Sequence, residues 1–402
     1  MIRELPKDIR KQIVPITFIH TVLFTGYRMV YPFLPAIARG LGVSYQAVSL
    51  GVTIRASFGV LTPFLGSISD IRGRKVVLVW SLIIFAGGMV LMDLAPTLIG
   101  LYIGLILTAL GRMMFDPTSR AYLGDRVPIQ QQGMAIALTE IGWSASSLIA
   151  MPIMGLAIAS GDWTTPLPWL AGSAVVGAVL MQISIPPDAK NRDPDASWRG
   201  NLAHLFNNKS AVTGIAIGFI TAMAMDMVMI AYAVWLEGSF GFKVAALGAT
   251  GILLGFAELC GEGVIAAYSD RLGMRKSLGL GIGFTILASL LLPGLEKTLV
   301  GALAGLFLFS FGYESVVVAI MPFTTGIVPK ARATALSTLM AARAGGHALG
   351  AFIGSKIIAE TITRNALLSG GLNLAALLLL LLFVRKPEQP EETGETEQCM
   401  QT

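Results

Sequence analysis

Apolar segments long enough to form membrane helices recur along the whole chain, separated by short polar loops. A helix needs about 20 mostly apolar residues to cross the hydrocarbon core of a bilayer. The first six segments lie near residues 13–37, 46–69, 76–95, 97–123, 131–158 and 166–185. The other six lie near residues 210–236, 244–269, 277–295, 298–327, 331–359 and 365–385. This pattern predicts an all-α membrane protein with twelve transmembrane helices in two pseudo-symmetric six-helix bundles.

The longest polar interruption covers residues 186–209 and divides the segments six and six. We therefore expect an N-terminal six-helix bundle over residues 1–185, a cytoplasmic central loop over 186–209 and a C-terminal six-helix bundle over 210–385. The short acidic segment 386–402 is expected to be a disordered cytoplasmic tail.

Charged residues are scarce and unevenly placed. Hydrophobic residues make up 54% of the chain and charged residues 13%, whereas soluble domains carry about 25% charged residues. The net charge is +5, but about nineteen basic residues lie in loops on one side and about four on the other, which marks the basic side as cytoplasmic. Both termini should then face the cytoplasm. The excess of basic residues is thus explained without a nucleic-acid partner. We expect a monomer in a plasma membrane, and a bacterial inner membrane is favoured.

Two short matches indicate that the halves are related. Ser69–Lys75 follows the second apolar segment, and the similar Ser269–Lys276 follows the eighth. Val127-Pro128 and Val328-Pro329 follow the fourth and tenth segments at nearly the same offset. Their shared order predicts an internal duplication, which is a common way to build transporters.

The segment Gly66–Lys75 contains a glycine, three residues, and then Asp-x-x-Gly-Arg-Lys. It resembles the signature loop of the major facilitator superfamily, which lies between spans two and three, and the resemblance covers nearly the whole chain. It implies movement by alternating access and a cytoplasmic conformational latch. The latch residues implied are Gly66, Asp70, Gly73, Arg74, Asp125 and, from the second copy, Asp270. Arg74 is expected to pair with Asp125, and Asp70 to face a helix N-terminus of the other half. A purely topological role for the basic residues stays open.

Charged residues within the spans are the next signal, because they are costly in lipid and mark functional sites. The resemblance places spans one, four, seven and ten around a central cavity. The cavity residues implied are Arg28, Tyr31, Arg112, Asp116, Asp226 and Glu314. Arg112, Asp116 and Arg120 also share one helix face, so an internal salt-bridge ladder is an alternative for span four.

A carboxylate removed from water takes up a proton more readily. Asp226 and Glu314, with Glu258 third, are therefore the candidates for proton coupling, and a structural ion pair is the alternative for each. Three His and two Cys offer no obvious metal site, and no cofactor is expected. No nucleotide-hydrolysis or protease motif indicates an enzyme.

We therefore predict a secondary active transporter of a small organic solute. The length and the signature loop resemble the drug and sugar efflux branches of this superfamily, so proton-coupled export is favoured. Membrane lipid is expected to surround the protein. Uptake by symport or facilitated diffusion uses the same architecture and stays open. A non-transporting sensor or scaffold is the alternative from another class. A sensor would need a sizeable soluble domain, and a scaffold would not need buried charges.

Overall fold

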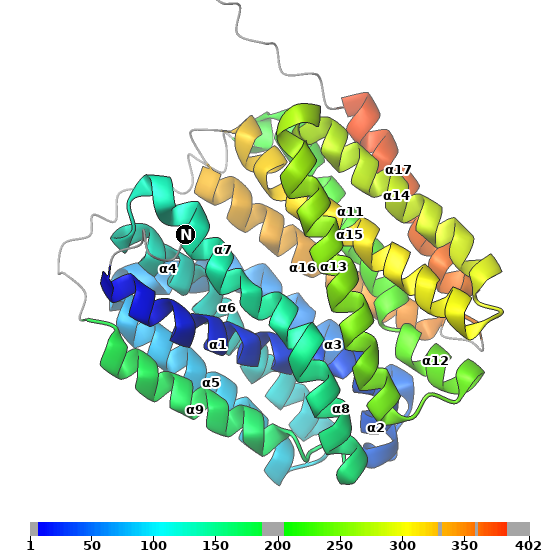
Figure 1. Ribbon diagram of the computed structural model, residues 1–402, viewed down its shortest axis with the longest axis horizontal. Coiled ribbons are helices and arrows are strands. Elements are labelled where there is room, and N and C mark those ends of the chain that lie inside the picture. Colours follow the sequence, from blue (N-terminus) through cyan, green and yellow to red (C-terminus); the bar gives the residue numbers. More distant parts are fainter. Residues whose placement is uncertain (1–6, 187–204, 329–331, 358–360, 384–402) are drawn as a thin grey trace, which may run out of the picture.

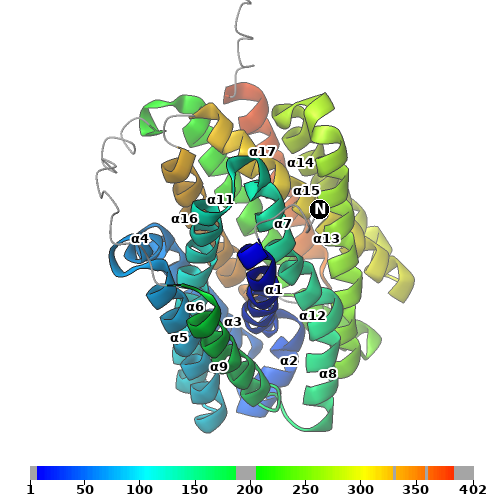
Figure 2. The same cartoon turned by 60° about the vertical axis from the view of Figure 1, so that its left-hand side comes forward.

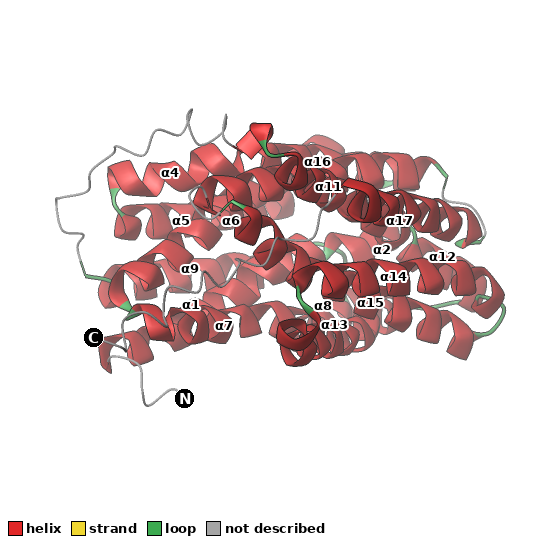
Figure 3. Ribbon diagram, turned by 90° about the horizontal axis from the view of Figure 1, so that it is seen from above, coloured by secondary structure: helices red, strands yellow, loops and turns green. Residues whose placement is uncertain are grey.

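The computed structural model describes residues 7–186, 205–328, 332–357 and 361–383, and these ranges are almost entirely helical, without a strand (Figure 3). Within them, ten helices are long and apolar enough to cross a membrane, and the bent pair α1 (Lys7–Arg28) and α2 (Val30–Leu41) makes an eleventh span. α16 (Arg332–Lys356) is the twelfth and is less apolar. The predicted fold class is thus confirmed, with six spans in each half.

The N-terminal half lies at the lower left of Figure 1, in blue to green. After α1 and α2, its elements are α3 (Tyr45–Ser57), η2 (Phe58–Leu61), α4 (Thr62–Arg72), α5 (Arg74–Leu94), α6 (Leu98–Arg126), α7 (Ile129–Ala145), η3 (Ser146–Ala150), α8 (Met151–Ser160) and α9 (Leu167–Ser184). Spans two and five are therefore each built from three successive segments.

The C-terminal half occupies the upper right of Figure 1. Besides α16, its helices are α11 (Lys209–Met229), α12 (Tyr232–Phe240), α13 (Val244–Leu272), α14 (Met274–Leu295), α15 (Leu299–Ile327) and α17 (Thr363–Phe383). Most of the predicted central loop over 186–209 and the whole tail over 386–402 lie outside the described residues, so those two predictions stay untested.

The two halves repeat the same packing. α5 packs against α6 as α14 does against α15, and α1 packs against α7 as α11 does against α16. The turns after spans two and eight also match, because Gly73 and Gly273 both have positive φ values, of 92° and 81°. Glycine adopts this conformation without steric cost. The shared packing and the shared turn geometry support the duplication inferred from the sequence.

Proline interrupts the first span. α1 and α2 meet at an angle of 51°. Pro32 has no N–H to donate to the carbonyl of Arg28, and its ring crowds that carbonyl, which bends the helix there. The break in span seven, between α11 and α12, occurs at Ile230, which is 201 residues after the break at Met29, although no proline lies there. Both broken spans run between the two halves, where α2 contacts α12 and α13.

The halves meet along two seams, which can be followed in Figures 1 and 2. In one seam, α8 and η3 pack on α13, and in the other, α3 and η2 pack on α16. A Cβ atom built on Gly248 would lie 2.8 Å from the Cα atom of Gly155, and one built on Gly59 would lie 2.4 Å from the Cβ atom of Ala344. Small residues thus allow the two bundles to approach closely at both seams.

Candidate substrate and proton site

An ion pair joins the two halves at the bend of span one. Arg28, the last residue of α1, makes a bidentate contact with Glu258 of α13, with Nη1 donating to Oε2 at 3.0 Å and Nη2 to Oε1. The guanidinium carbon also lies 4.2 Å from the ring centroid of Trp143. The pairing of Arg28 with Glu258 was not predicted, because it depends on the relative register of the two bundles.

A second polar contact between the halves lies on the other side of the same bend. The hydroxyl of Tyr31 in α2 donates to Asp226 Oδ2 at 3.4 Å, and His347 Nδ1 lies 3.1 Å from the same oxygen. Asp226 is buried, with 2% of its surface exposed. The structure therefore places two of the predicted cavity residues, Tyr31 and Asp226, side by side and adds His347 from span eleven.

Glu314 is buried and has no hydrogen-bond or ion-pair partner among the described residues. It packs against α13 at Gly261, where a Cβ atom would lie 3.3 Å from the Cβ atom of Glu314. Glu258 and Glu262 flank this glycine on α13, and both act electrostatically on Glu314. Three carboxylates therefore gather between spans eight and ten, and Arg28 is the only cation that contacts one of them directly in the described part of the chain.

The charged face of span four divides into two pairs. Arg112 Nε donates to Asp116 Oδ2 at 3.1 Å, whereas Arg120 turns to Glu140 of α7, with Nη2 donating at 2.9 Å. The internal ladder considered from the sequence is thus only half formed. Asp116 Oδ1 also lies 3.8 Å from Nδ1 of the fully buried His20.

Two buried arginines are held without a carboxylate contact. Arg55 Nη1 donates to the backbone oxygen of Tyr27 at 2.6 Å, and its guanidinium carbon lies 4.0 Å from the Tyr27 ring centroid. Arg343 Nη2 donates to the hydroxyl of Tyr313 at 3.0 Å. Aromatic rings and neutral acceptors therefore stabilise these two cations, in spans two and eleven.

The signature loop forms a compact ionic cluster within its own half. Arg74 Nη2 lies 2.7 Å from Asp70 Oδ1, Arg74 Nε lies 3.4 Å from Asp125 Oδ2, and Nη1 donates to Ser69. The expected contact between Arg74 and Asp125 is therefore present. Asp70 contacts Arg74 of the same half, so its expected contact with the other half stays a prediction. The surroundings of Gly66 and the side chain of Asp270 lie outside the described part of the structure, so their roles in the latch stay predictions.

A family model of the Major Facilitator Superfamily matches residues 16–295 and 214–399. The chain belongs to the Major Facilitator Superfamily. It is 24% identical over 360 residues to the inner membrane transport protein YdhP of Escherichia coli (strain K12), covering 89% of this chain and 91% of that protein. It is 26% identical over 281 residues to the multidrug resistance protein MdtG of Proteus mirabilis (strain HI4320), covering 65% and 67%.

A solved structure shares the facilitator fold. It is the crystal structure of a bacterial homologue of the human lysosomal transporter Spinster, in an inward-facing and unoccupied conformation. The match has a TM-score of 0.77 at 15% identity and covers 94% of this chain and 97% of the other. This similarity, with the family match, makes the chain a multi-pass membrane transporter.

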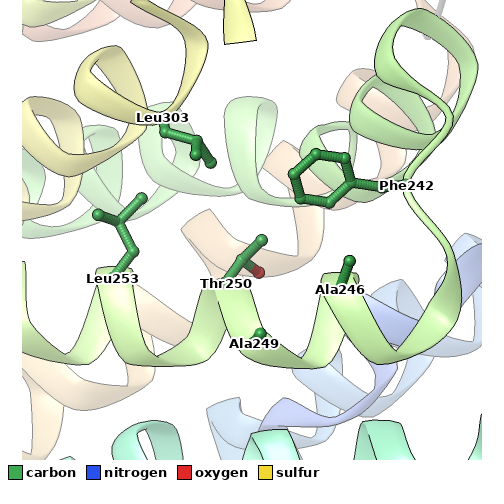
Figure 4. A pocket seen from close by; sticks show the side chains of 6 residues that line it. All are labelled: Phe242, Ala246, Ala249, Thr250, Leu253 and Leu303. Carbon is green, nitrogen blue, oxygen red and sulfur yellow. The ribbon is translucent and has the colours of Figure 1, made fainter. Parts of the chain in front are cut away.

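An apolar recess of this facilitator has no charged residue in its lining. It is lined from α13, the loop before it and α15, as Figure 4 shows. The lining residues are Phe242, Ala246, Ala249, Thr250, Leu253 and Leu303. Because Thr250 supplies the only side-chain polar atom there, and its hydroxyl donates to the backbone of Leu247, the recess offers no chemistry for proton coupling.

An ion pair joins the halves of this facilitator at the end opposite the signature loop. Arg39 of α2 pairs with Glu237 of α12, and their side chains are 54% and 24% exposed. A partly exposed pair contributes about 1 kcal/mol or less. We expect the variants Arg39→Glu and Glu237→Arg each to change the transport rate a few-fold by placing like charges together, and the double variant to recover the original rate. If the effects of the two single substitutions simply add in the double variant, the transport rate does not depend on the pairing of these two charges.

Proposed function

We propose that this protein is a proton-coupled exporter of small organic cations that works by alternating access. The observation that carries the proposal is the balance of charge inside the bundle. Away from the ends of the spans, the described residues include five arginines and six carboxylates. They are Arg28, Arg55, Arg112, Arg120 and Arg343 against Asp116, Glu140, Asp226, Glu258, Glu262 and Glu314. One negative charge is left over when the histidines are neutral.

A surplus carboxylate in a low-dielectric interior needs a compensating positive charge. A proton and a monovalent organic cation each supply one. A site that accepts either, but gains nothing from holding both, exchanges one for the other as the two halves alternate. This exclusivity is what antiport requires. An anionic solute would add to the surplus, so the charge balance favours a cation.

Glu314 is the carboxylate that we assign to the exchange. Asp116, Glu140 and Glu258 each contact an arginine, and Asp226 contacts Tyr31 and His347. Glu262 is more exposed than Glu314. Glu314 alone combines burial with the lack of a direct polar partner in the described ranges.

Two kinds of observation support the direction of transport and the location in a bacterial inner membrane. One relative is named a multidrug resistance protein and another an inner membrane transport protein. The placement of basic loops favours cytoplasmic termini. We therefore propose a location in the bacterial inner membrane, with the signature loop on the cytoplasmic side, where the cluster around Arg74 would act as a latch.

Transport by purified protein in proteoliposomes tests the proposal. A panel would contain cations such as tetraphenylphosphonium, ethidium and benzamidine, together with neutral benzamide and anionic benzoate. With a pH gradient imposed, we expect at least one cation to move against its gradient while protons move the other way. Movement of cation and proton in the same direction would replace export by symport. A lack of solute-dependent proton movement for every compound would contradict proton coupling.

A further inference from the structure

The guanidinium of Arg28 occupies a site between Glu258 and Trp143, called the seat below, that would suit a flat organic cation. One edge of the group faces both carboxylate oxygens of Glu258, and one face lies over the indole of Trp143. Trp143 is itself held by Phe24, whose ring meets it edge-on with centroids 5.0 Å apart. A planar, delocalised cation uses both features at once, whereas a tetrahedral ammonium group cannot match the bidentate geometry.

A second carboxylate is available to the same arginine. Glu314 acts electrostatically on Arg28, so two anionic groups of the C-terminal half attract this cation, Glu258 on α13 by direct contact and Glu314 on α15 without one. The absence of a side chain at Gly261 brings α15 close to α13 and so brings Glu314 near Glu258. Arg28 occupies only one of these two positions in the structure.

We propose that Arg28 is a tethered substitute for the transported solute, and that a guanidinium- or amidinium-type cation takes its place between Trp143 and Glu258 while Arg28 moves to ionised Glu314. This inference rests on the proposed function, since it names the solute class and the seat for proton-coupled export. The side chain that leaves the seat belongs to the N-terminal half, and both carboxylates belong to the other half. When Arg28 exchanges Glu258 for Glu314, an ion pair between the two halves is therefore broken and another one is formed.

The position of Arg28 favours such a movement. It is the last residue of α1, directly before the bend, and the carbonyl that it contributes has no helical N–H donor from Pro32. The helix is already interrupted directly after Arg28, so its long side chain can reorient without disrupting regular helix on that side. Its partner Glu258 lies in the middle of the uninterrupted helix α13, so we assign the movement to the arginine.

The proton on Glu314 then decides which cation occupies the seat. When Glu314 is protonated, it offers Arg28 no charge, so Arg28 stays on Glu258 and excludes the solute. When Glu314 is ionised, Arg28 gains a second partner and the solute can bind. The charged groups that act on Glu314 are Glu258 and Glu262 from α13, Arg28 from α1 and Arg343 from α16. Proton and solute thus exclude each other through one arginine.

Binding of benzamidine to purified full-length protein tests this inference, with calorimetry as the readout. Benzamide has nearly the same shape without the charge and is the matched control. We expect wild-type protein to bind benzamidine roughly tenfold or more tightly than benzamide, because a charge-assisted contact adds about 1.5–3 kcal/mol. Trp143→Leu should weaken benzamidine binding and leave the weak binding of benzamide unchanged.

Variants of Arg28 separate a competitor from a structural ion pair. Removing a competitor raises the fraction of protein with an empty seat, so Arg28→Ala should bind benzamidine roughly tenfold more tightly than wild type. Arg28→Lys keeps the charge, fits Glu258 less well, and should bind with intermediate affinity. It also carries the test if Arg28→Ala fails to fold. Monodisperse variants that bind benzamidine no more tightly than wild type would overturn the inference, as would equal binding of benzamide.

The two proposals fail in different ways. A protein that moves protons with other cations in proteoliposomes, but does not bind benzamidine, overturns the assignment of the solute class and leaves the proposed function intact. A protein that moves no protons with any solute overturns the proposed function, whatever it binds.

Discussion

Replacing Glu314 with Gln is expected to lower pH-gradient-driven transport of an organic cation roughly tenfold or more. The variant loses the contact that ionised Glu314 would make with a cation during exchange, and such a charge-assisted contact is worth about 1.5–3 kcal/mol. Gln has almost the shape of protonated Glu, so packing at Gly261 should be retained. The interior of Glu314→Gln would contain as many arginines as carboxylates, and neither a proton nor a cation would be needed for balance. The rate that remains should also be independent of pH over the range in which wild-type transport changes.

Glu262→Gln is the matched control. Glu262 lies on the same side of α13 as Glu258, one turn away, and acts on Glu314 electrostatically, but it is more exposed. Water compensates a partly exposed carboxylate better than a buried one, so the removal of Glu262 should change transport only a few-fold. Initial rates in proteoliposomes at several pH values would compare the two variants. Equal losses in both, or pH-dependent transport by Glu314→Gln, would contradict the assignment of Glu314.

The largest effect on stability is expected at Gly346 in span eleven. A Cβ atom there would lie 2.1 Å from the backbone oxygen of Phe219 in α11, and backbone cannot move aside as a flexible side chain can. Gly350 and Gly354 continue the same contact along α16. Gly346→Ala should therefore destabilise the C-terminal half by about 1–3 kcal/mol, the usual cost of overpacking. A lower melting temperature of the detergent-purified protein would show it.

Gly283→Ala is the control for this prediction. Gly283 is also a helical glycine of the C-terminal half, in α14, but nothing lies within 4 Å of the position of its missing Cβ atom. There, Ala should be neutral or stabilise by about 0.5–1 kcal/mol, because it restricts the unfolded chain. Melting of both variants at the same temperature would show that α16 does not depend on the close contact.

The fold was predictable because lipid imposes a simple pattern. Each span must be apolar for about 20 residues, and lysine and arginine mark one side of the membrane. The breaks were not predicted: Pro32 accounts for the bend in span one once the structure is known, and no proline lies at the break at Ile230 in span seven. The close contact of span eleven with α11 depends on glycines at every fourth position, Gly346, Gly350 and Gly354.

The candidate site was predicted as a set of residues but not as a set of pairs. Buried charges stand out in an apolar sequence, so Arg28, Asp226 and Glu314 were readily found. Their partners depend on how one bundle sits against the other, which no local pattern encodes. His347 was not among the predicted site residues, and only the packing of α16 places it beside Asp226. Within one half, prediction worked better, as the contact of Arg74 at the start of α5 with Asp125 at the end of α6 shows.

The most direct test of the central claim is the number of protons released when a cation binds. The purified protein in detergent, in weakly buffered solution with a pH indicator, would be titrated with the cation that gives the fastest proton-linked transport in the panel. If proton and solute compete for one surplus carboxylate, binding near the pH of half-protonation releases a proton from each protonated site, and saturation from the acid side approaches about one proton per bound cation. Glu314→Gln should release none. Binding of the cation to wild-type protein without proton release would contradict the claim.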